Sequence, residues 1–233
     1  MDSPAVKITH VIFDVDGLII DTERVYTECL EEICAEYGCE FTWEIKSQQM
    51  GKKEREAAQV LIDALKIPMT VDEYVHKLKA RLEVKLPSVP LMPGAEKLIR
   101  HLHNNNIPIA LASGSDGWGF KRKTAGHKEL FALFHHTVLS SDDPDVKHGK
   151  PAPDCFLVAA KRFGDDPNPA EILVFEDAPN GAEAGVAAGM HVVWVPDPRA
   201  DRTVLQDRVD QTLDSLEQFR PERFGLPAYS ESV

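Results

Sequence analysis

Short runs of apolar, mostly β-branched residues recur along the chain, and each is closed by a polar or charged residue or by a proline. The four clearest runs occupy residues 11–13, 109–112, 172–175 and 192–195. Runs of this length are typical of strands buried on both faces of a parallel sheet, and helical patterns lie between them. Residues 135–139 form a weaker candidate strand. We therefore predict an α/β fold with a Rossmann-like parallel sheet core and helices on both faces.

The spacing between the first two predicted strands is much longer than the others. The second run begins only at residue 109, whereas a parallel crossover needs about a dozen residues or somewhat more. The intervening segment carries apolar residues at helical spacing, and prolines mark its end. We therefore predict a small helical cap domain inserted after the first strand. Its expected extent is residues 20–89, within a catalytic core of residues 1–19 and 90–233.

Charge and cysteine content restrict the partners and the compartment. The formal net charge is −12, which argues against nucleic acid or an anionic membrane as a partner. No apolar stretch approaches the length of a membrane span, and the N-terminal residues lack the basic region of a signal peptide. The four cysteines form no CxxC pair, so we expect reduced thiols. We expect a cytoplasmic protein that is a monomer or a weak homodimer.

Two carboxylates follow the first predicted strand directly. Asp14 and Asp16 are separated by one residue, and Gly17 comes next. Ligands of open parallel sheets bind at the carboxyl ends of the strands, so both acids are placed to meet a cation and a substrate. Gly17 would allow a sharp turn into the insertion. Taken alone, the same residues also suit a simple turn, in which Asp and Gly are common.

Three further segments place chemical groups at strand ends or ahead of a helix. Ser113 follows the second run, Lys150 precedes a predicted helix, and Glu176 and Asp177 follow the run at 172–175. Each has an ordinary interpretation as a helix cap or a surface residue. Because parallel strands all point the same way, we expect these side chains to converge on one edge of the sheet. Together with the first two acids they suit phosphoryl transfer, which depends on positioning and charge neutralisation.

The order of these motifs resembles one known family. DVDG, ALAS, GKPAPD and FEDAPNG, in that order, resemble the haloacid dehalogenase superfamily, specifically its phosphatases with a helical cap inserted after the first motif. The resemblance covers essentially the whole chain. Finer features, such as Met50-Gly51-Lys52-Lys53 and the segment 91–98, resemble the animal pseudouridine-5′-phosphatases of that superfamily.

The resemblance implies a role for each motif residue. Asp14 would attack phosphorus and become an aspartyl phosphate, and Asp16 would protonate the leaving oxygen and then activate water. The implied phosphate-binding residues are Ser113, Gly114 and Lys150. The implied Mg²⁺ ligands are Asp14, the backbone carbonyl of Asp16 and Asp177, with Glu176 beside the ion or bound to it directly. The implied substrate-selecting residues of the cap are Gly51, Lys52 and Lys53.

Three functions follow as alternatives. The first is a Mg²⁺-dependent phosphomonoesterase acting on a small phosphorylated metabolite, foremost pseudouridine 5′-phosphate. The second is a sugar phosphomutase, which shares this core and cap. The third is a non-enzymatic binding module that has kept the fold. Dehalogenation needs no proton donor for an alkoxide, so the presence of Asp16 favours phosphoryl transfer.

Overall fold

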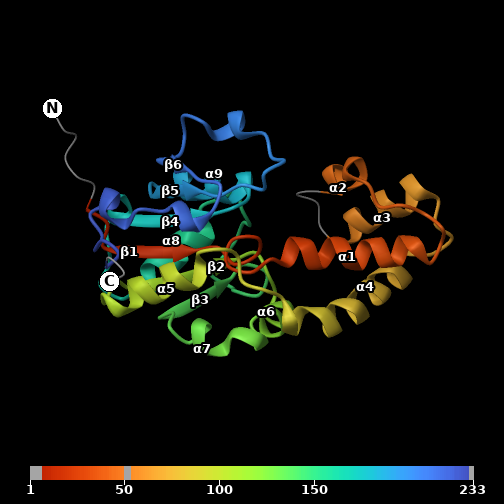
Figure 1. Cartoon of the computed structure of the whole chain (residues 1–233), viewed down its shortest axis with the longest axis horizontal. Coiled ribbons are helices and arrows are strands. Elements are labelled where there is room, and N and C mark those ends of the chain that lie inside the picture. The colour runs from red at the N-terminus through yellow and green to blue at the C-terminus, as the bar shows by residue number, and fades with distance from the viewer. Residues whose placement is uncertain (1–6, 50–53, 231–233) are drawn as a thin grey trace. The chain divides into compact units, whose positions relative to one another are not determined.

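The chain forms two compact units, which are described separately. The computed structural model describes residues 7–49 and 54–230 (Figure 1). One unit comprises Met1–Asp21 and Pro90–Val233, and the other comprises Thr22–Val89. The assignment of the first as a catalytic core and the second as a cap stays a prediction.

The first unit is built on one six-stranded parallel sheet. Its strand order is β3-β2-β1-β4-β5-β6, and every paired strand runs parallel to its neighbour. The strands are β1 (His10–Phe13), β2 (Ile109–Ser113), β3 (His136–Leu139), β4 (Ile172–Glu176), β5 (His191–Trp194) and β6 (Gln211–Thr212). The predicted parallel α/β core is therefore confirmed. The edge strand β6 was not predicted, because its two half-buried polar residues form no apolar run.

Helices cover the sheet. The α-helices of this unit are α5 (Ala95–Asn104), α6 (Gly117–Lys123), α7 (Lys128–Phe131), α8 (Asp154–Lys161) and α9 (Pro179–Ala187). The short 3₁₀ helices of this unit are η2 (Ala125–His127), η3 (Pro169–Glu171), η4 (Arg202–Leu205), η5 (Leu216–Gln218) and η6 (Pro221–Phe224). The amphipathic helix α5 buries Leu98, Ile99 and Leu102, which lie on one face at helical spacing.

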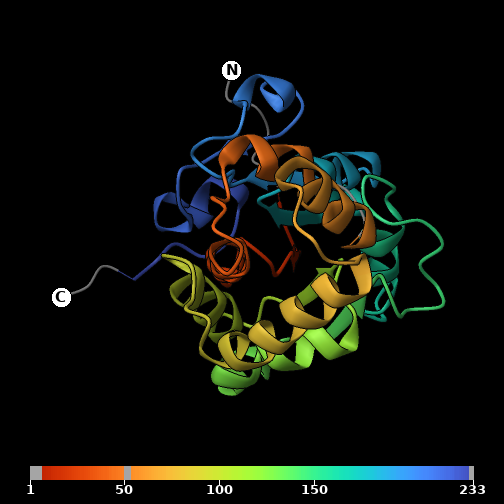
Figure 2. The same cartoon turned by 90° about the vertical axis from the view of Figure 1, so that its right-hand side faces the viewer.

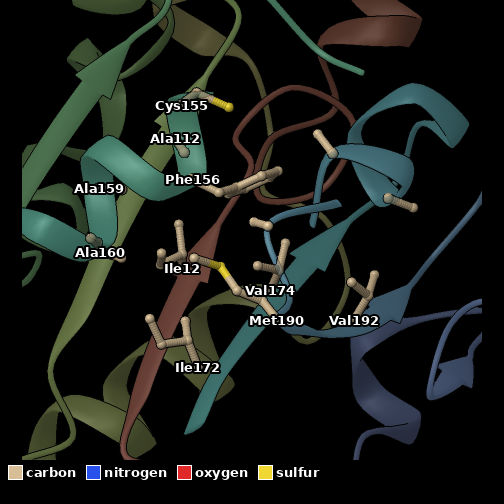
Figure 3. Close-up of a cluster of buried hydrophobic side chains, with 14 of the residues drawn as sticks. Ile12, Ala112, Cys155, Phe156, Ala159, Ala160, Ile172, Val174, Met190 and Val192 are labelled. Carbon is tan, nitrogen blue, oxygen red and sulfur yellow. The ribbon is translucent and has the colours of Figure 1, made fainter. Parts of the chain in front are cut away.

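The hydrophobic core on one face of the sheet lies under α8 and α9. Phe156 and Ala159 of α8 pack with Ile12 of β1 and Val174 of β4, and all four are fully buried (Figure 3). Phe13 follows Ile12 in β1, and Phe175 follows Val174 in β4. The rings of Phe13 and Phe175 stack with their centroids 4.9 Å apart. Side chains alternate along a strand, so β1 has apolar residues toward both faces, as a central parallel strand requires.

The central position of β1 determines where a ligand can bind. Val11 lies opposite Ile109 of β2 on one side and opposite Leu173 of β4 on the other. From β1 the chain extends the sheet first toward β3 and later toward β6, so the order reverses at β1. Such a switch point leaves a crevice at the carboxyl ends of the strands, where ligands of open α/β sheets bind.

The described residues of the second unit form helices joined by loops. It contains α1 (Thr22–Ala35), α2 (Trp43–Gln49), α3 (Glu54–Leu65), α4 (Val71–Lys85) and the 3₁₀ helix η1 (Leu86–Ser88). Helix α1 packs against α4, and α3 packs against both α2 and α4 (Figures 1 and 2). Val25, Cys29 and Ile33 of α1 recur every four residues and are buried. Thr70 and Glu73 form a capping box that begins α4.

All four cysteines are free thiols, and Cys29, Cys34 and Cys155 are buried. Among residues 7–49 and 54–230, no helix has the length and apolar character needed to cross a bilayer.

The residue before α5, Gly94, lies close to the backbone of η5. Gly94 has a φ of +84°, and a Cβ added there would lie 2.4 Å from the backbone N of Glu217. Gly164 has a similar φ of +89°, but a Cβ there would meet nothing within 4 Å.

We expect Gly94→Ala to lower the free energy of unfolding by about 3 kcal/mol, because the backbone strain of a positive φ and the clash with Glu217 both contribute. Gly164→Ala should cost about 1 kcal/mol from strain alone. Urea unfolding of both variants measures this, and equal losses would show that the backbone contact can relax.

Candidate active site

A buried lysine shared by two carboxylates lies at the carboxyl ends of β1 and β4. Lys150 Nζ lies 2.6 Å from Asp14 Oδ1 and 2.5 Å from Glu176 Oε1, and it donates to the carbonyl of Ala112 at 3.0 Å. The side chains of Lys150 and Asp14 are each 9% exposed, and that of Glu176 is 1% exposed. Water is therefore largely excluded from this group, and each charge depends on the others for compensation.

Local hydrogen bonds explain how Lys150 reaches this place. It belongs to the loop that precedes α8, and Asp154 at the start of α8 accepts from the backbone N–H groups of Lys147 and His148 at 3.0 and 2.9 Å. The carboxylate thereby folds the loop back onto the helix. The ring of Phe156, in the hydrophobic core, has its centroid 5.0 Å from Lys150 Nζ. The core of the sheet thus supports the site directly.

Glu176 is held by the backbone that follows it. Its Oε2 accepts from the N–H groups of Asp177 and Ala178 at 3.0 and 3.1 Å, while Oε1 faces Lys150. A Cβ at position 181 would lie 1.8 Å from Glu176 Oε1, so only glycine leaves room for the carboxylate here. Gly181, in the Pro-Asn-Gly segment that begins α9, therefore leaves the space that the Glu176 carboxylate occupies.

Three carboxylates could hold a cation. Asp14, Glu176 and Asp177 each offer an oxygen, and these oxygens lie within 4.8 Å of one another. A Cβ at Gly17 would lie 2.2 Å from Asp177 Oδ2, so the glycine after the second acid keeps this space open. The all-oxygen donor set suits a hard cation such as Mg²⁺ better than zinc. The residues present therefore fit the predicted ion.

Burial and neighbouring charges shift the ionisation of this group. Burial raises the pKa of Asp14 to about 7; Lys150 opposes this rise, whereas Glu176 and Asp16 add to it. Burial by itself would lower the pKa of Lys150, but the adjacent Asp14 and Glu176 outweigh it and raise that pKa. Lys150 therefore stays charged, and Asp14 is a carboxylate whose ionisation depends on added positive charge.

Asp16 belongs to a second cluster. Its Oδ2 accepts from Ser115 Oγ at 2.9 Å and from Ser113 Oγ at 3.3 Å. Lys123 Nζ lies 2.6 Å from Oδ1 and 2.5 Å from Oδ2 of the same carboxylate. Lys123 also donates to Ser115 Oγ. Each of the first two acids therefore has a lysine of its own.

Most of the predicted residues come together, and two partners were missed. Asp14, Lys150, Glu176 and Asp177 form the first cluster, and Asp16 and Ser113 belong to the second. Gly114 is exposed, and its carbonyl accepts from Ser141 Oγ at 2.8 Å. Gly51, Lys52 and Lys53 lie outside the described residues. The roles assigned to all these residues stay predictions.

The missed partners are Lys123 and Ser115. Lys123 ends the basic run Lys121-Arg122-Lys123. Such a run is typical of an exposed helix C-terminus, where the helix dipole favours positive charge. The burial of Lys123 depends on the tertiary packing that brings the end of α6 to Asp16, which no local pattern reports. Ser115 is two residues past the predicted Ser113 and carried no separate signal.

Comparison with known proteins identifies close relatives of the chain. A family model for haloacid dehalogenase-like hydrolases matches residues 8–189. A Drosophila melanogaster protein named "Probable pseudouridine-5′-phosphatase" is 48% identical over 225 residues, which are 97% of each chain. An Arabidopsis thaliana "(DL)-glycerol-3-phosphatase 2" is 48% identical over 229 residues, covering 97% of this chain and 95% of the relative.

A solved structure shares the fold. The crystal structure of a "putative beta-phosphoglucomutase" from Thermotoga maritima superposes with a TM-score of 0.76 and 25% identity. The match covers 94% of this chain and 97% of that one. The arrangement of the sheet and its helices is therefore that of this group of proteins.

The raised pKa of Asp14 predicts a pH-dependent effect on stability. A carboxyl whose pKa rises on folding favours the folded state at low pH, and this contribution is lost as the pH rises from the unfolded value of 3.8 through about 7. Without divalent cations at pH 8, we therefore expect Asp14→Asn to raise the free energy of unfolding by about 1–3 kcal/mol. The gain should vanish near pH 4.

Thermal melting with a chelator at both pH values measures this difference. Asp207→Asn, at an exposed position, is the matched control and should change neither melting temperature by more than a degree or so. A variant less stable than the wild type at pH 8 would show that the pairing with Lys150 outweighs the burial of Asp14.

Proposed function

We propose that this chain, which belongs to the haloacid dehalogenase-like hydrolases, removes phosphate from a small soluble monoester with Mg²⁺ and through an aspartyl phosphate on Asp14. That it is a phosphatase follows from the family and from relatives that carry that name at 48% identity. The observation that carries the mechanism is the buried Asp14 carboxylate, held 2.6 Å from Lys150 at the end of the central strand.

The first step forms a bond between phosphorus and an oxygen of Asp14. The bond between phosphorus and the leaving oxygen breaks, and Asp16 gives its proton to that oxygen, so an alcohol departs. In the second step water attacks the phosphorus, Asp16 takes the proton of the water, and the bond from Asp14 to phosphorus breaks. Inorganic phosphate leaves, and both acids return to their starting states. A carboxylate nucleophile thus divides one difficult hydrolysis into two easier steps.

Positive charge must accompany the phosphate group into this acidic site. Lys150 and the hydroxyl of Ser113 would bind the phosphoryl oxygens, assisted by the amide of Gly114. Bound Mg²⁺ would supply the charge that offsets repulsion between a phosphate dianion and the carboxylates. Its proposed ligands are Asp14, Asp177 and the carbonyl of Asp16. Because Glu176 already binds Lys150 and two backbone N–H groups, we assign it to orienting Lys150 beside the ion.

The proposed natural substrate is pseudouridine 5′-phosphate. The named relative from Drosophila supports this choice, and the equally similar Arabidopsis glycerol-3-phosphatase makes glycerol 3-phosphate the principal competitor. Gly51, Lys52 and Lys53 are the residues that we propose to select the leaving group. We further propose a cytoplasmic monomer or weak homodimer.

A phosphomutase is the second candidate, because the Thermotoga structure of that name shares the fold. A mutase would return phosphate to a bisphosphate acceptor instead of releasing it. Product analysis with a hexose phosphate and a catalytic amount of its bisphosphate separates the two functions. An isomer formed without net inorganic phosphate would establish the mutase.

The phosphatase mechanism predicts a dependence on both the cation and Asp14. Removal of Mg²⁺ with a chelator should abolish phosphate release, and added Mg²⁺ should restore it. Asp14→Asn should lower kcat by at least about 10³-fold, because the nucleophile is lost. Inorganic phosphate release is the measurement. Equal activity with and without Mg²⁺ would contradict the mechanism, and an active Asp14→Asn variant would exclude the aspartyl phosphate.

A substrate panel tests the specificity. We expect kcat/KM for pseudouridine 5′-phosphate to exceed those for glycerol 3-phosphate and uridine 5′-monophosphate by at least about tenfold. Uridine 5′-monophosphate is the matched control, because it differs only in the bond between base and ribose. A preference for glycerol 3-phosphate would assign the chain to the other activity. No release from any monoester would favour the binding module.

A further inference from the structure

Lys123 is a buried lysine that is paired with the carboxylate of Asp16. It is 4% exposed, although Lys121 on the same short helix is exposed to solvent. A lysine is rarely buried unless its charge is paired. The ammonium group contacts both oxygens of Asp16, at 2.6 and 2.5 Å, and it also donates to Ser115 Oγ.

Hydrogen bonds hold both ends of α6, whose last residue, Lys123, contacts Asp16 just after β1. Asp116 caps the helix by accepting from the N–H of Gly119 at 2.7 Å, and the N–H of Gly117 donates to Asp142 at 2.6 Å. Thr124, just after the helix, bonds back to the carbonyl of Phe120 at 2.8 Å. The contact between Lys123 and Asp16 therefore joins the anchored helix to the segment that follows β1.

We propose that Lys123 is a positioning residue that, together with Ser115, holds the carboxyl group of Asp16 where it meets the leaving oxygen. This inference rests on the proposed role of Asp16 as the proton donor. Lys123 bridges both carboxyl oxygens, and Ser115 and Ser113 fix Oδ2, so rotation of the side chain is restricted. Proton transfer needs hydrogen-bond reach to the leaving oxygen, and a misplacement of about 1 Å can cost roughly 10²-fold.

The leaving group distinguishes this role from a general effect on the site. An alkyl phosphate expels a strongly basic alkoxide, which needs the proton from Asp16. p-Nitrophenyl phosphate expels a weakly basic phenolate, which leaves without one. The kcat/KM reports the steps up to the first irreversible one, so it is insensitive to the later role of Asp16 toward water. A residue that positions Asp16 therefore matters for the first substrate and little for the second.

The experiment compares Lys123→Met, which removes the charge and keeps the length, with Lys121→Met as the matched control. For glycerol 3-phosphate we expect Lys123→Met to lower kcat/KM about 10²-fold, and for p-nitrophenyl phosphate less than about threefold. Lys121→Met should change neither value. Lys123→Arg, which restores the charge, should recover part of the loss on glycerol 3-phosphate.

Asp16→Asn provides the benchmark that separates this inference from the proposed function. If Asp16→Asn lowers kcat/KM equally for both substrates, the acid role of Asp16 fails. If Asp16→Asn selectively impairs glycerol 3-phosphate but Lys123→Met impairs both substrates equally, or only raises KM, the positioning role of Lys123 is overturned.

Ser115→Ala is the second variant, for the case in which Lys123→Met does not fold. It removes one hydrogen bond to Asp16 and leaves the lysine in place. The expected loss is about tenfold on glycerol 3-phosphate with little change on p-nitrophenyl phosphate. Thermal melting confirms that each variant is folded, and an equal loss on both substrates would overturn the positioning cluster.

Discussion

The first cluster of the site depends on the buried ammonium group of Lys150, which lies between Asp14 and Glu176. Removing such charges from water costs several kcal/mol per ion, and close pairing recovers this only in part. The arrangement is therefore weak evidence for stability and stronger evidence for function. Glu176 also accepts from the backbone N–H groups of Asp177 and Ala178, which fixes its carboxylate beside Lys150. The ammonium group of Lys150 thus links the carboxyl end of β4 to that of β1.

The two acids of the first motif occupy different electrostatic surroundings. Asp14 is buried beside Lys150 and other acids, and its pKa is raised to about 7. Asp16 is held by Lys123 and two serine hydroxyls. Within a strand, residues two apart point to the same face. Because β1 ends at Phe13, Asp14 and Asp16 lie beyond the strand and can face different partners. The proposed mechanism needs Asp14 ionised, so it depends on the positive charge that a bound cation would add beside this carboxylate.

Prediction from the sequence succeeded where local pattern and strand order were sufficient. Short apolar runs identified β1, β2, β4 and β5, and the rule that parallel strand ends converge placed Asp14, Lys150, Glu176 and Asp177 together. It failed for β6, whose residues are polar, and for Lys123, whose burial depends on the packing of α6. Nothing in a run of three basic residues reveals which one points inward. Tertiary packing, and not composition, decides that question.

The central place of β1 also affects how the protein is made. Its hydrogen-bonding partners are residues 109–111 on one side and 172–175 on the other, so β1 gains its second neighbour only after residues 172–175 have been made. Until β4 has been synthesised, a segment of four buried residues remains an open edge that can pair with other chains. The helical unit of residues 22–89 is compact by itself and is made from one continuous stretch of chain, so it can form in the meantime. The carboxylates at positions 14, 16, 176 and 177 can therefore come together only after residue 177 has been made, so the site is assembled well after its first residues are synthesised.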